Sequence, residues 1–365
     1  MRKVKLHIVG THGVPAKYGG FETLADYLCQ NLERVFDITV YCNSKKYQEK
    51  KSNYFGANLK YLPIDASGVT GIVYDVISFI HACRAADIIL YLSPVGSGFV
   101  IPLKYIFGKK VVVNHGGLNE WEREKLTWLQ KKWAKFNHNV AAHSSNVNIA
   151  DNYHYKQSLK ENFGVESTVI RYGGDHVKKI PQSRKDLHFK YPFTDKKYAL
   201  SISRAQVDNN LHLILKSFES FISYPLVLIS NWNVSDYGKK LYEKYKSSKN
   251  IIVLDAIYEK EELDYIRCNA YVYIHSHSRC GTAPSLVEVM NLNLPVISFD
   301  IPTNHETTQG KALFFKSAAE LKKILLNLDD KVLESNRSNM YHIASSEYTW
   351  RTISSQYNRI FKSII

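Results

Sequence analysis

The residues with the clearest chemical potential lie at 270–288, where a predicted strand, a glycine turn and a predicted helix follow one another. The first of them are β-branched and aromatic, which favours a buried strand. Gly281 supplies the turn, and Thr282 or Ser285 can cap a helix that begins near Pro284. A helix N-terminus at the carboxyl end of a parallel strand offers N–H groups and a positive dipole to a phosphate. The stretch predicts an anion-binding turn; the alternative is an ordinary strand–helix connection.

A carboxylate and a guanidinium could complete such a site. Glu288 falls about one turn inside the predicted helix, where it can accept hydrogen bonds from two neighbouring hydroxyls, as on a ribose. Arg204 directly follows a predicted strand at 198–203 and precedes Asn209, Asn210 and a further predicted helix. The planar guanidinium fork matches the spacing of phosphate oxygens. We therefore expect Arg204 to clamp a phosphate.

Other reactive side chains carry weaker signals. His275 and His277 alternate along a strand and should share one face, but without a third evident ligand they do not predict a zinc site. Cys280 as a covalent nucleophile would need an activating base, and none can be assigned. The paired Asp329 and Asp330 fall late in a predicted helix, where a solvated face explains them. We expect no metal and no cofactor.

A glycine-rich loop follows the first predicted strand, 4–10, and ends at Gly19 and Gly20 before an amphipathic helix at 21–32. The loop lacks the G-x-G-x-x-G spacing, which disfavours a dinucleotide-dependent hydride transfer. Paired glycines still let a ligand approach the backbone closely, so we expect them to line a sugar or phosphate site. His115 also follows a predicted strand, at the edge where such sheets bind ligands, and could orient a sugar hydroxyl.

Length and composition limit the classes of protein. A chain of 365 residues with 45% hydrophobic and 22% charged residues is expected to fold as two globular domains. The net charge of +14 favours anionic partners, either nucleotides or an acidic membrane face. Nucleic acid is disfavoured because no reading module or arginine-rich arm is present. Five cysteines without a C-x-x-C spacing, and no apolar run of about 18 residues, favour a cytoplasmic protein.

Strand and helix patterns alternate along the chain, which predicts an α/β fold of two doubly wound, Rossmann-like domains. We place these domains at 1–180 and 181–346, with a linker at 172–185 and a last helix at 347–365 that packs back on the first domain. The other strands are predicted at 37–42, 59–63, 87–92, 110–114, 139–143, 167–171, 225–230, 250–254 and 295–299. The other helices are predicted at 71–85, 96–107, 121–137, 210–222, 236–246, 259–267, 284–292 and 317–327.

The predicted helix at 121–137 mixes tryptophans with lysines. Trp121, Lys125, Trp128, Lys132 and Phe136 would share one face, as in helices that lie on an anionic membrane surface. Alternatively, the aromatic rings pack on the sheet and the lysine stems lie along its edge. Both interpretations stay open.

Taken together, these motifs resemble the retaining glycosyltransferases of family 4, which have the GT-B fold, and among them the bacterial rhamnosyltransferase-like members. The resemblance covers nearly the whole chain. Its residues are Gly10–Thr23, Glu120–Arg123, Tyr172–Asp175, Arg204 with Asp208–Asn210, His275–Ser278, Gly281–Glu288, Asp300 and Asn304.

The resemblance implies two domains facing across a cleft that holds a nucleoside-diphosphate sugar. Catalytic roles would fall to Arg204, Glu288 and His115. The donor-binding residues would be Gly19, Gly20, Arg204, Asn209, Asn210, His277, Gly281, Thr282, Ser285 and Glu288. The implied reaction transfers a sugar such as L-rhamnose, with retention, to a saccharide or a polyprenyl-diphosphate-linked saccharide. Cell-surface polysaccharide synthesis at the inner face of the cytoplasmic membrane would be the setting.

The sequence departs from the family pattern at three positions and carries one inserted residue, Asn119, before Glu120. Cys280 stands where an acidic residue is common, Asn209 where a lysine is common, and Ala283 where the rhamnosyltransferase-like members have asparagine. These changes leave open which sugar is bound. They also keep two alternatives in view: a sugar-nucleotide 2-epimerase of the same fold, and a catalytically silent saccharide-binding or assembly protein.

Overall fold

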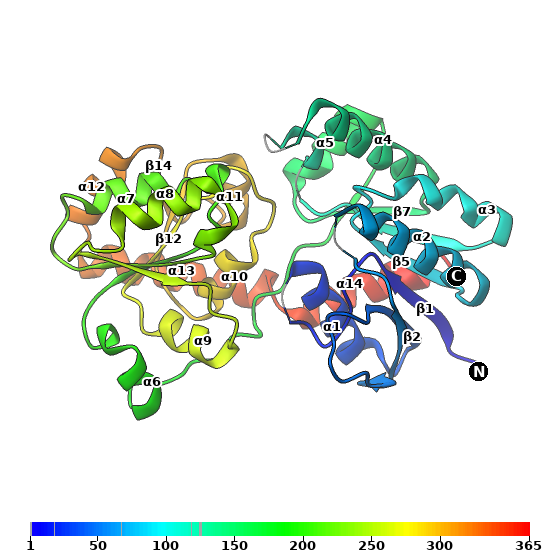
Figure 1. Cartoon of the computed structure of the whole chain (residues 1–365), viewed down its shortest axis with the longest axis horizontal. Coiled ribbons are helices and arrows are strands. Elements are labelled where there is room, and N and C mark those ends of the chain that lie inside the picture. Colours follow the sequence, from blue (N-terminus) through cyan, green and yellow to red (C-terminus); the bar gives the residue numbers. More distant parts are fainter. Residues whose placement is uncertain (1, 18, 67, 118, 124–125) are drawn as a thin grey trace. The chain divides into compact units, whose positions relative to one another are not determined.

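Two mainly parallel sheets organise the chain, one in each of two units (Figure 1). The computed structural model describes residues 2–17, 19–66, 68–117, 119–123 and 126–365. Unit 1 comprises Met1–Arg171 with Trp350–Ile365, and unit 2 comprises Tyr172–Thr349. The segment predicted as a linker at 172–185 thus lies within unit 2, and the predicted boundary between 180 and 181 falls inside that unit. The expected α/β class, with two Rossmann-like domains, is confirmed.

The sheet of unit 1 contains β1 (Val4–Val9), β2 (Phe36–Asn43), β3 (Asn53–Tyr54), β4 (Ala57–Leu62), β5 (Ile88–Leu92), β6 (Lys110–Asn114), β7 (Val147–Ala150) and β8 (Thr168–Val169). Their order is β3-β4-β2-β1-β5-β6-β7-β8, and the β3–β4 pair is antiparallel. In the parallel register, Leu6 lies opposite both Ile38 and Ile88.

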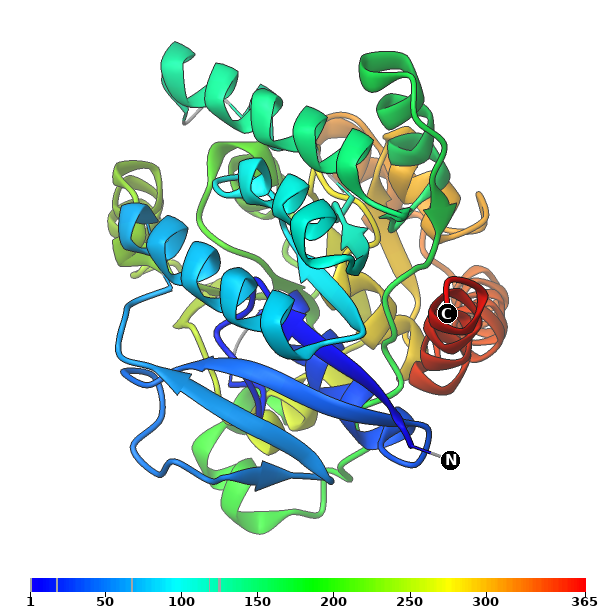
Figure 2. The same cartoon turned by 90° about the vertical axis from the view of Figure 1, so that its right-hand side faces the viewer.

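The helices of unit 1 are α1 (Gly20–Leu32), α2 (Gly68–Ala85), η1 (Gly98–Leu103), α3 (Lys104–Phe107), η2 (Glu120–Glu122), α4 (Trp128–Ser144), α5 (Tyr153–Phe163) and α14 (Trp350–Ser363). Residues of α2, η1 and α4 share one buried core on the sheet, and Figure 2 shows these helices side by side. The terminal helix α14 packs on α1, where Trp350 stacks on Tyr27 with ring centroids 4.6 Å apart. It also reaches the sheet, because Asn114 Nδ2 donates to Tyr357 Oη at 2.7 Å.

The sheet of unit 2 contains β9 (Ala199–Ile202), β10 (Leu226–Ser230), β11 (Ile251–Asp255), β12 (Val272–His275), β13 (Val296–Phe299) and β14 (Leu313–Phe315). The order is β11-β10-β9-β12-β13-β14, and every pair among them is parallel. The chain therefore builds outward from β9 in one direction and from β12 in the other. In open α/β sheets, ligands bind outside the carboxyl ends of the strands at such a switch point.

The helices of unit 2 are α6 (Lys185–Lys190), η3 (Pro192–Asp195), η4 (Val207–Asn209), α7 (Leu211–Phe218), η5 (Trp232–Val234), α8 (Asp236–Tyr245), α9 (Lys260–Cys268), α10 (Pro284–Asn291), α11 (Pro302–Thr307), α12 (Ala318–Leu326) and α13 (Asp330–Glu347). Side chains of α7, α8 and α12 form one buried core on the sheet, and those of α9, α10 and α13 form another. Helices therefore cover both faces of the sheet, as expected of a doubly wound domain.

Several predicted elements were wrong. The strand predicted at 139–143 lies inside α4, which begins at a capping box formed by Thr127 and Gln130 and runs on to Ser144. Half of the helix predicted at 96–107 is a 3-10 helix that contains Pro102, and α3 follows it. Asp329 does not lie late in a helix: its side chain caps α13 by accepting from Val332 N.

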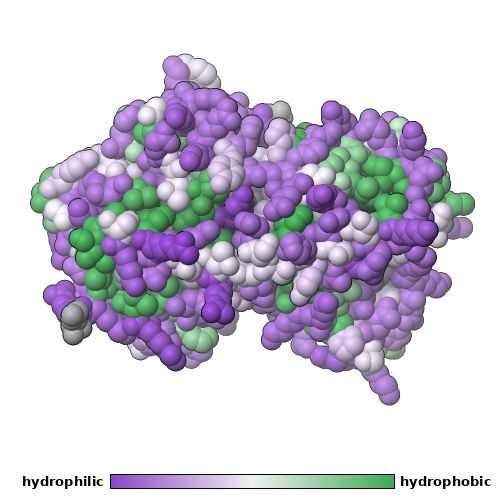
Figure 3. Space-filling view, turned by 180° about the vertical axis from the view of Figure 1, so that it is seen from behind, coloured by the Kyte–Doolittle hydropathy of each residue, from purple (hydrophilic) through white to green (hydrophobic). Residues whose placement is uncertain are grey.

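The aromatic face predicted around 121–137 is divided in the structure. Trp121 is buried against His138 and Phe163, whereas Trp128 is 64% exposed on α4. Lys125, which was assigned to the same face, lies outside the described residues. Figure 3 shows one side of the molecule, where hydrophobic residues gather in patches among hydrophilic ones. Over the described part of the chain, no helix is both long and apolar enough to cross a membrane.

The contact between α14 and α1 makes a stability prediction. Trp350 is 2% exposed, so Trp350→Ala should destabilise unit 1 by about 3–5 kcal/mol, because the cavity adds to the lost burial. Hydrogen exchange of peptides from unit 1 measures the effect. Trp128→Ala, which truncates an exposed tryptophan of the same unit, is the matched control and should change exchange little. Equal protection from hydrogen exchange in the two variants would contradict a stabilising contact between α14 and α1.

Candidate functional site

The loops that follow β9 and β12 are joined by hydrogen bonds at the switch point of unit 2. Ser278 N donates to Asp208 O at 2.9 Å, and Ser276 Oγ donates to Asn209 O at 2.5 Å. In return, Asn210 Nδ2 donates to Ser276 O at 3.1 Å. The residues predicted to clamp a phosphate and those predicted to form the anion-binding turn therefore belong to one connected structure.

Arg204 is exposed, and His277, which is partly buried, lies near enough to feel the charge of its guanidinium. The Nε2 atom of His277 lies 2.9 Å from Ser203 Oγ, which fixes the orientation of the ring. Burial and the Arg204 guanidinium lower the pKa of His277 to about 3, so the imidazole is neutral near pH 7. A neutral, oriented imidazole next to a guanidinium can bind a polar group of an anionic ligand.

The N-terminus of α10 is not capped by a side chain. Its N-cap residue is Ala283, and Pro284 occupies the first turn. The capping predicted for Thr282 or Ser285 was therefore wrong; the Ser285 side chain instead hydrogen-bonds the hydroxyl of Tyr273. The departure from the family pattern at 283 thus has a structural consequence, because no side-chain oxygen neutralises the positive end of the helix dipole at the N-cap.

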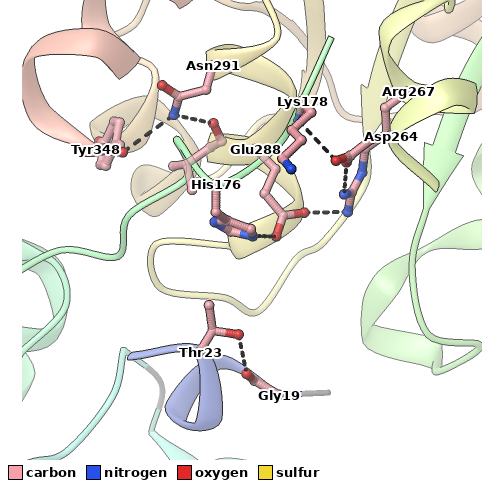
Figure 4. Close-up of polar contacts among 10 residues, drawn as sticks. Gly19, Thr23, His176, Lys178, Asp264, Arg267, Glu288, Asn291 and Tyr348 are labelled. Atoms are coloured by element: carbon pink, nitrogen blue, oxygen red, sulfur yellow. Dashed lines mark hydrogen bonds and ion pairs between the residues drawn. The ribbon is translucent and has the colours of Figure 1, made fainter. Parts of the chain in front are cut away.

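Glu288 is buried and held by two side chains (Figure 4). Its Oε1 atom lies 3.1 Å from His176 Nε2, and its Oε2 atom pairs with Arg267, which also pairs with Asp264 at 3.2 Å. Burial opposes ionisation of Glu288, but Arg267 and His176 outweigh it and lower its pKa to about 2.

The depressed pKa of Glu288 has a consequence for stability. The pKa of the folded state lies below the ordinary value of 4.5, so the carboxylate stabilises unit 2 above pH 4.5. That contribution is lost as the pH falls through the folded pKa of about 2. At neutral pH the group is an oriented anion that still has lone pairs for hydroxyl donors.

Asn209 and Asn210 hold the loops in place. Asn209 is buried and its Nδ2 donates to Arg204 O at 2.8 Å, which fixes the backbone of the predicted clamp. Asn210 adopts a left-handed conformation with φ of 51°. Both amide groups thus donate within the protein, and their predicted contact with a sugar donor stays a prediction.

Cys280 lies beside His275 and His277. The Sγ atom is 3.8 Å from His275 Nε2, and one ligand atom from each of the three residues lies within 4.8 Å of the others. Cys280 is therefore the third potential metal ligand that the sequence did not reveal. Cys280 Sγ also lies 3.3 Å from Asn304 Oδ1.

The glycine-rich loop of unit 1 is organised by Glu22. Its Oε1 atom accepts from His12 N at 2.9 Å and from Thr11 Oγ1 at 3.2 Å. Gly19 has φ of 122°, and a Cβ at this position would overlap the Glu22 carboxylate. The Gly19 carbonyl accepts from Thr23 Oγ1 at 2.9 Å as α1 begins at Gly20 (Figure 4). Glycine is therefore required at 19 by the loop itself, whatever ligand binds there.

His115 lies inside unit 1, only 3% exposed. Its Nδ1 atom lies 3.1 Å from Nδ1 of His138, and its Nε2 atom lies 2.8 Å from Asn148 Oδ1. Burial lowers the pKa of His115 to about 4 although Asn148 opposes this shift. Both ring nitrogens are engaged within the protein, so the geometry favours a structural role, and the predicted catalytic role gains no support from it.

Three residues of the site were missed from the sequence: His176, Asp264 and Arg267. His176 follows Tyr172–Asp175 directly, a segment that was interpreted as a linker. Asp264 and Arg267 lie one turn apart on α9 as an i, i+3 pair. The sequence pattern of this segment indicates only an ordinary amphipathic helix. A buried Glu288 implies a cationic partner, which is the one signal that could have prompted a search for them.

Family comparisons divide the chain much as the structure does. Residues 1–175 match a family described as a domain of unknown function, DUF1972, and residues 183–339 match the family described as Glycosyl transferases group 1. A search of curated proteins found no match.

Solved structures share the fold over the whole chain. Sucrose-phosphate synthase from Thermosynechococcus elongatus is 13% identical with a TM-score of 0.83, covering 99% of both chains. HepE from Anabaena, in complex with UDP, is 14% identical with a TM-score of 0.74, covering 99% of this chain and 100% of that one. A glycosyltransferase from Rickettsia africae is 13% identical with a TM-score of 0.74, covering 100% and 99%. The chain thus has the expected GT-B fold, and its glycosyl transferase domain identifies it as a glycosyltransferase.

The ion pairs around Glu288 predict a large effect of Arg267. Arg267→Met should destabilise unit 2 by about 3–5 kcal/mol, because it leaves two buried carboxylates without their cation. Denaturant unfolding measures the change. Arg184→Met is the matched control: Arg184 also pairs with two carboxylates, but at the surface, and its loss should change stability little. Equal losses in the two variants would show that burial of the Glu288 pair does not matter.

Proposed function

We propose that the protein transfers a sugar from a nucleoside-diphosphate donor to a saccharide acceptor with retention of anomeric configuration. The observation that carries the proposal is the connected loop pair at the switch point of unit 2. It brings an exposed arginine, a neutral histidine and an uncapped helix N-terminus to the place where doubly wound sheets bind ligands.

Charge on the leaving group is the main obstacle to the reaction. When the glycosidic bond to phosphate breaks, the departing nucleoside diphosphate gains negative charge. In our scheme Arg204 and the backbone amides of 281–285 stabilise that charge, and one well-placed donor contributes about 3 kcal/mol. The Asn209 side chain donates a hydrogen bond to the Arg204 carbonyl, which fixes the backbone of Arg204 for this role. The leaving phosphate oxygen accepts the acceptor proton on the same face, which accounts for retention.

Glu288 is assigned to the ribose of the donor. Arg267 and His176 keep it ionised and oriented, so it can accept hydrogen bonds from two hydroxyls without the entropy cost of ordering a flexible side chain. UDP in the HepE complex makes a uridine donor the first to test. Because cationic side chains and helix amides supply the positive charge, the transfer is proposed to need no metal.

The resemblance of the motifs supports L-rhamnose as the sugar. It also supports a polyprenyl-diphosphate-linked saccharide as acceptor, in the synthesis of a cell-surface polysaccharide such as capsule or O-antigen. Gly19 and Gly20, at the switch point of unit 1, are assigned to the donor or acceptor side of the reaction. A lipid-linked acceptor would require the enzyme to work at the inner face of the cytoplasmic membrane.

Unit 1 has a surface suited to that location. We call it the aromatic–lysine surface; its residues are Phe99, Tyr105, Ile106, Trp128, Leu129, Lys131, Lys132, Trp133 and Phe136. Ile106 is 76% exposed on α3 and Leu129 is 70% exposed on α4, and both helices pack on η1. Lys132 Nζ lies 3.8 Å from the ring centroid of Trp128, so amine and ring are presented together. Exposed apolar rings with adjacent amines are suited to anionic lipid headgroups.

The assignment of Arg204 is tested by turnover. Arg204→Ala should lower the rate of nucleoside-diphosphate release from a nucleotide sugar by at least about tenfold, because the leaving group loses a charge-assisted donor. Arg184→Ala, at a surface ion pair, is the control and should leave the rate unchanged. An unchanged rate in Arg204→Ala would remove the diphosphate assignment.

The same assay separates the alternatives. Release of nucleoside diphosphate only when an acceptor is present indicates transfer, whereas an epimerised donor without an acceptor indicates the 2-epimerase. Neither product indicates a silent binding protein. Nucleotide sugars that raise the midpoint of thermal unfolding identify the donor to use, because a ligand that binds only the native state must stabilise it.

Membrane contact is tested by reversing charge on the aromatic–lysine surface. Lys131→Glu with Lys132→Glu should weaken binding to phosphatidylglycerol vesicles by at least about tenfold, since one lysine near an anionic surface contributes about 1 kcal/mol. Vesicle sedimentation measures this. Lys239→Glu with Lys240→Glu on α8 makes the same change in net charge on unit 2. Equal weakening in both would mean that net charge, and not this surface, governs binding.

A further inference from the structure

The proposed transfer gives a role to His277 but none to His275 or Cys280, which lie beside it. The two rings lie with centroids 4.3 Å apart, and Cys280 approaches from the turn before Gly281. His275 is 1% exposed, yet its Nδ1 atom has no hydrogen-bond partner within the described residues. Its Nε2 atom faces the Cys280 sulfur at 3.8 Å, longer than most hydrogen bonds. The weak contact at Nε2 lets that nitrogen share a further ligand with the Cys280 sulfur.

From this geometry we propose that His275, His277 and Cys280 bind a divalent cation of the zinc class. Two ligands of one tetrahedral zinc, with bond lengths of about 2.0 Å to nitrogen and about 2.3 Å to sulfur, lie about 3.6 Å apart. The observed separation of 3.8 Å between His275 Nε2 and Cys280 Sγ is close to this value. The widest separation within the group, below 4.8 Å, requires only small side-chain movements.

The ligand types select the ion. One thiolate with two imidazoles favours Zn²⁺ over Mg²⁺ or Ca²⁺, which prefer oxygen ligands. A contact outside the cluster orients one of the ligands: Ser203 Oγ lies 2.9 Å from His277 Nε2. Such outer contacts are typical of metal sites. The Cys280 thiol donates to Asn304 Oδ1 at 3.3 Å, and binding of the ion would release this proton.

Three protein ligands leave a fourth tetrahedral position for water or an exogenous oxygen. Cys280 directly precedes the turn assigned to the diphosphate, so a bound ion and a sugar donor would lie next to one another; this part of the inference rests on the proposed function. The ion would bind in addition to the sugar donor, and the proposed transfer does not require it.

Cobalt substitution tests the site directly, using the full chain without a sugar donor. Co²⁺ added to the wild-type protein should give a thiolate-to-cobalt charge-transfer band in the near ultraviolet and the intense visible bands of a tetrahedral ion, and Zn²⁺ should displace it. Cys280→Ser should abolish the charge-transfer band. Cys268→Ser, which removes a partly exposed thiol of the same unit, should retain it. A missing band in the wild type, or a band unchanged in Cys280→Ser, would overturn the proposal.

A second measurement needs no variant. Zn²⁺ should protect Cys280 from alkylation by iodoacetamide in the wild-type protein, as measured by mass spectrometry of the peptide that contains it, and Mg²⁺ should not. Equal alkylation with and without Zn²⁺ would contradict the site. Both experiments are independent of the transfer reaction: loss of the proposed function would appear as absent nucleotide release in metal-free enzyme, which neither measurement monitors.

Discussion

The functional half of this molecule depends on the adjacency of β9 and β12 in the sheet of unit 2. Because the chain builds outward from these two strands in opposite directions, their carboxyl ends leave a place that no crossover helix covers. The backbone groups of Asp208, Asn209 and Ser276 join the two loops there. This connection places Arg204 and the N-terminus of α10 in one structure, although 80 residues separate Arg204 from Pro284 in the sequence.

A second constraint is electrostatic. Glu288 is buried, and a buried carboxylate persists as an anion only when cations compensate its desolvation. Arg267 does so from α9, and His176, among the first residues of unit 2, lies within hydrogen-bond distance of the same carboxylate. The segment that begins unit 2 is therefore part of the site and not a passive connection. The uncapped start of α10 and the ionised Glu288 within the same helix place positive and negative groups at fixed positions, as recognition of a phosphorylated sugar nucleotide requires.

Local sequence patterns predicted the fold class well, because alternating strands and helices have distinct periods. The turn at Gly281 and the position of the clamp candidate Arg204 were predictable for the same reason: Arg204 comes just after β9, and Gly281 lies between β12 and α10. Other features depend on tertiary contacts that no local pattern encodes. A strand was predicted at 139–143, but α4, which begins at the capping box of Thr127, continues through these residues to Ser144. His115 had the expected position, but its burial beside His138 was not visible from the sequence. The pairing of Cys280 with His275 likewise needs the folded turn.

The central claim, one diphosphate site built from both loops, is tested most directly by hydrogen–deuterium exchange of the protein with a nucleoside, a nucleoside monophosphate and a nucleoside diphosphate. The account predicts that only the diphosphate slows exchange in peptides covering 203–210 and 276–288 together, and at the same ligand concentration. If the diphosphate protects only one of the two segments, or neither of them, the account is contradicted.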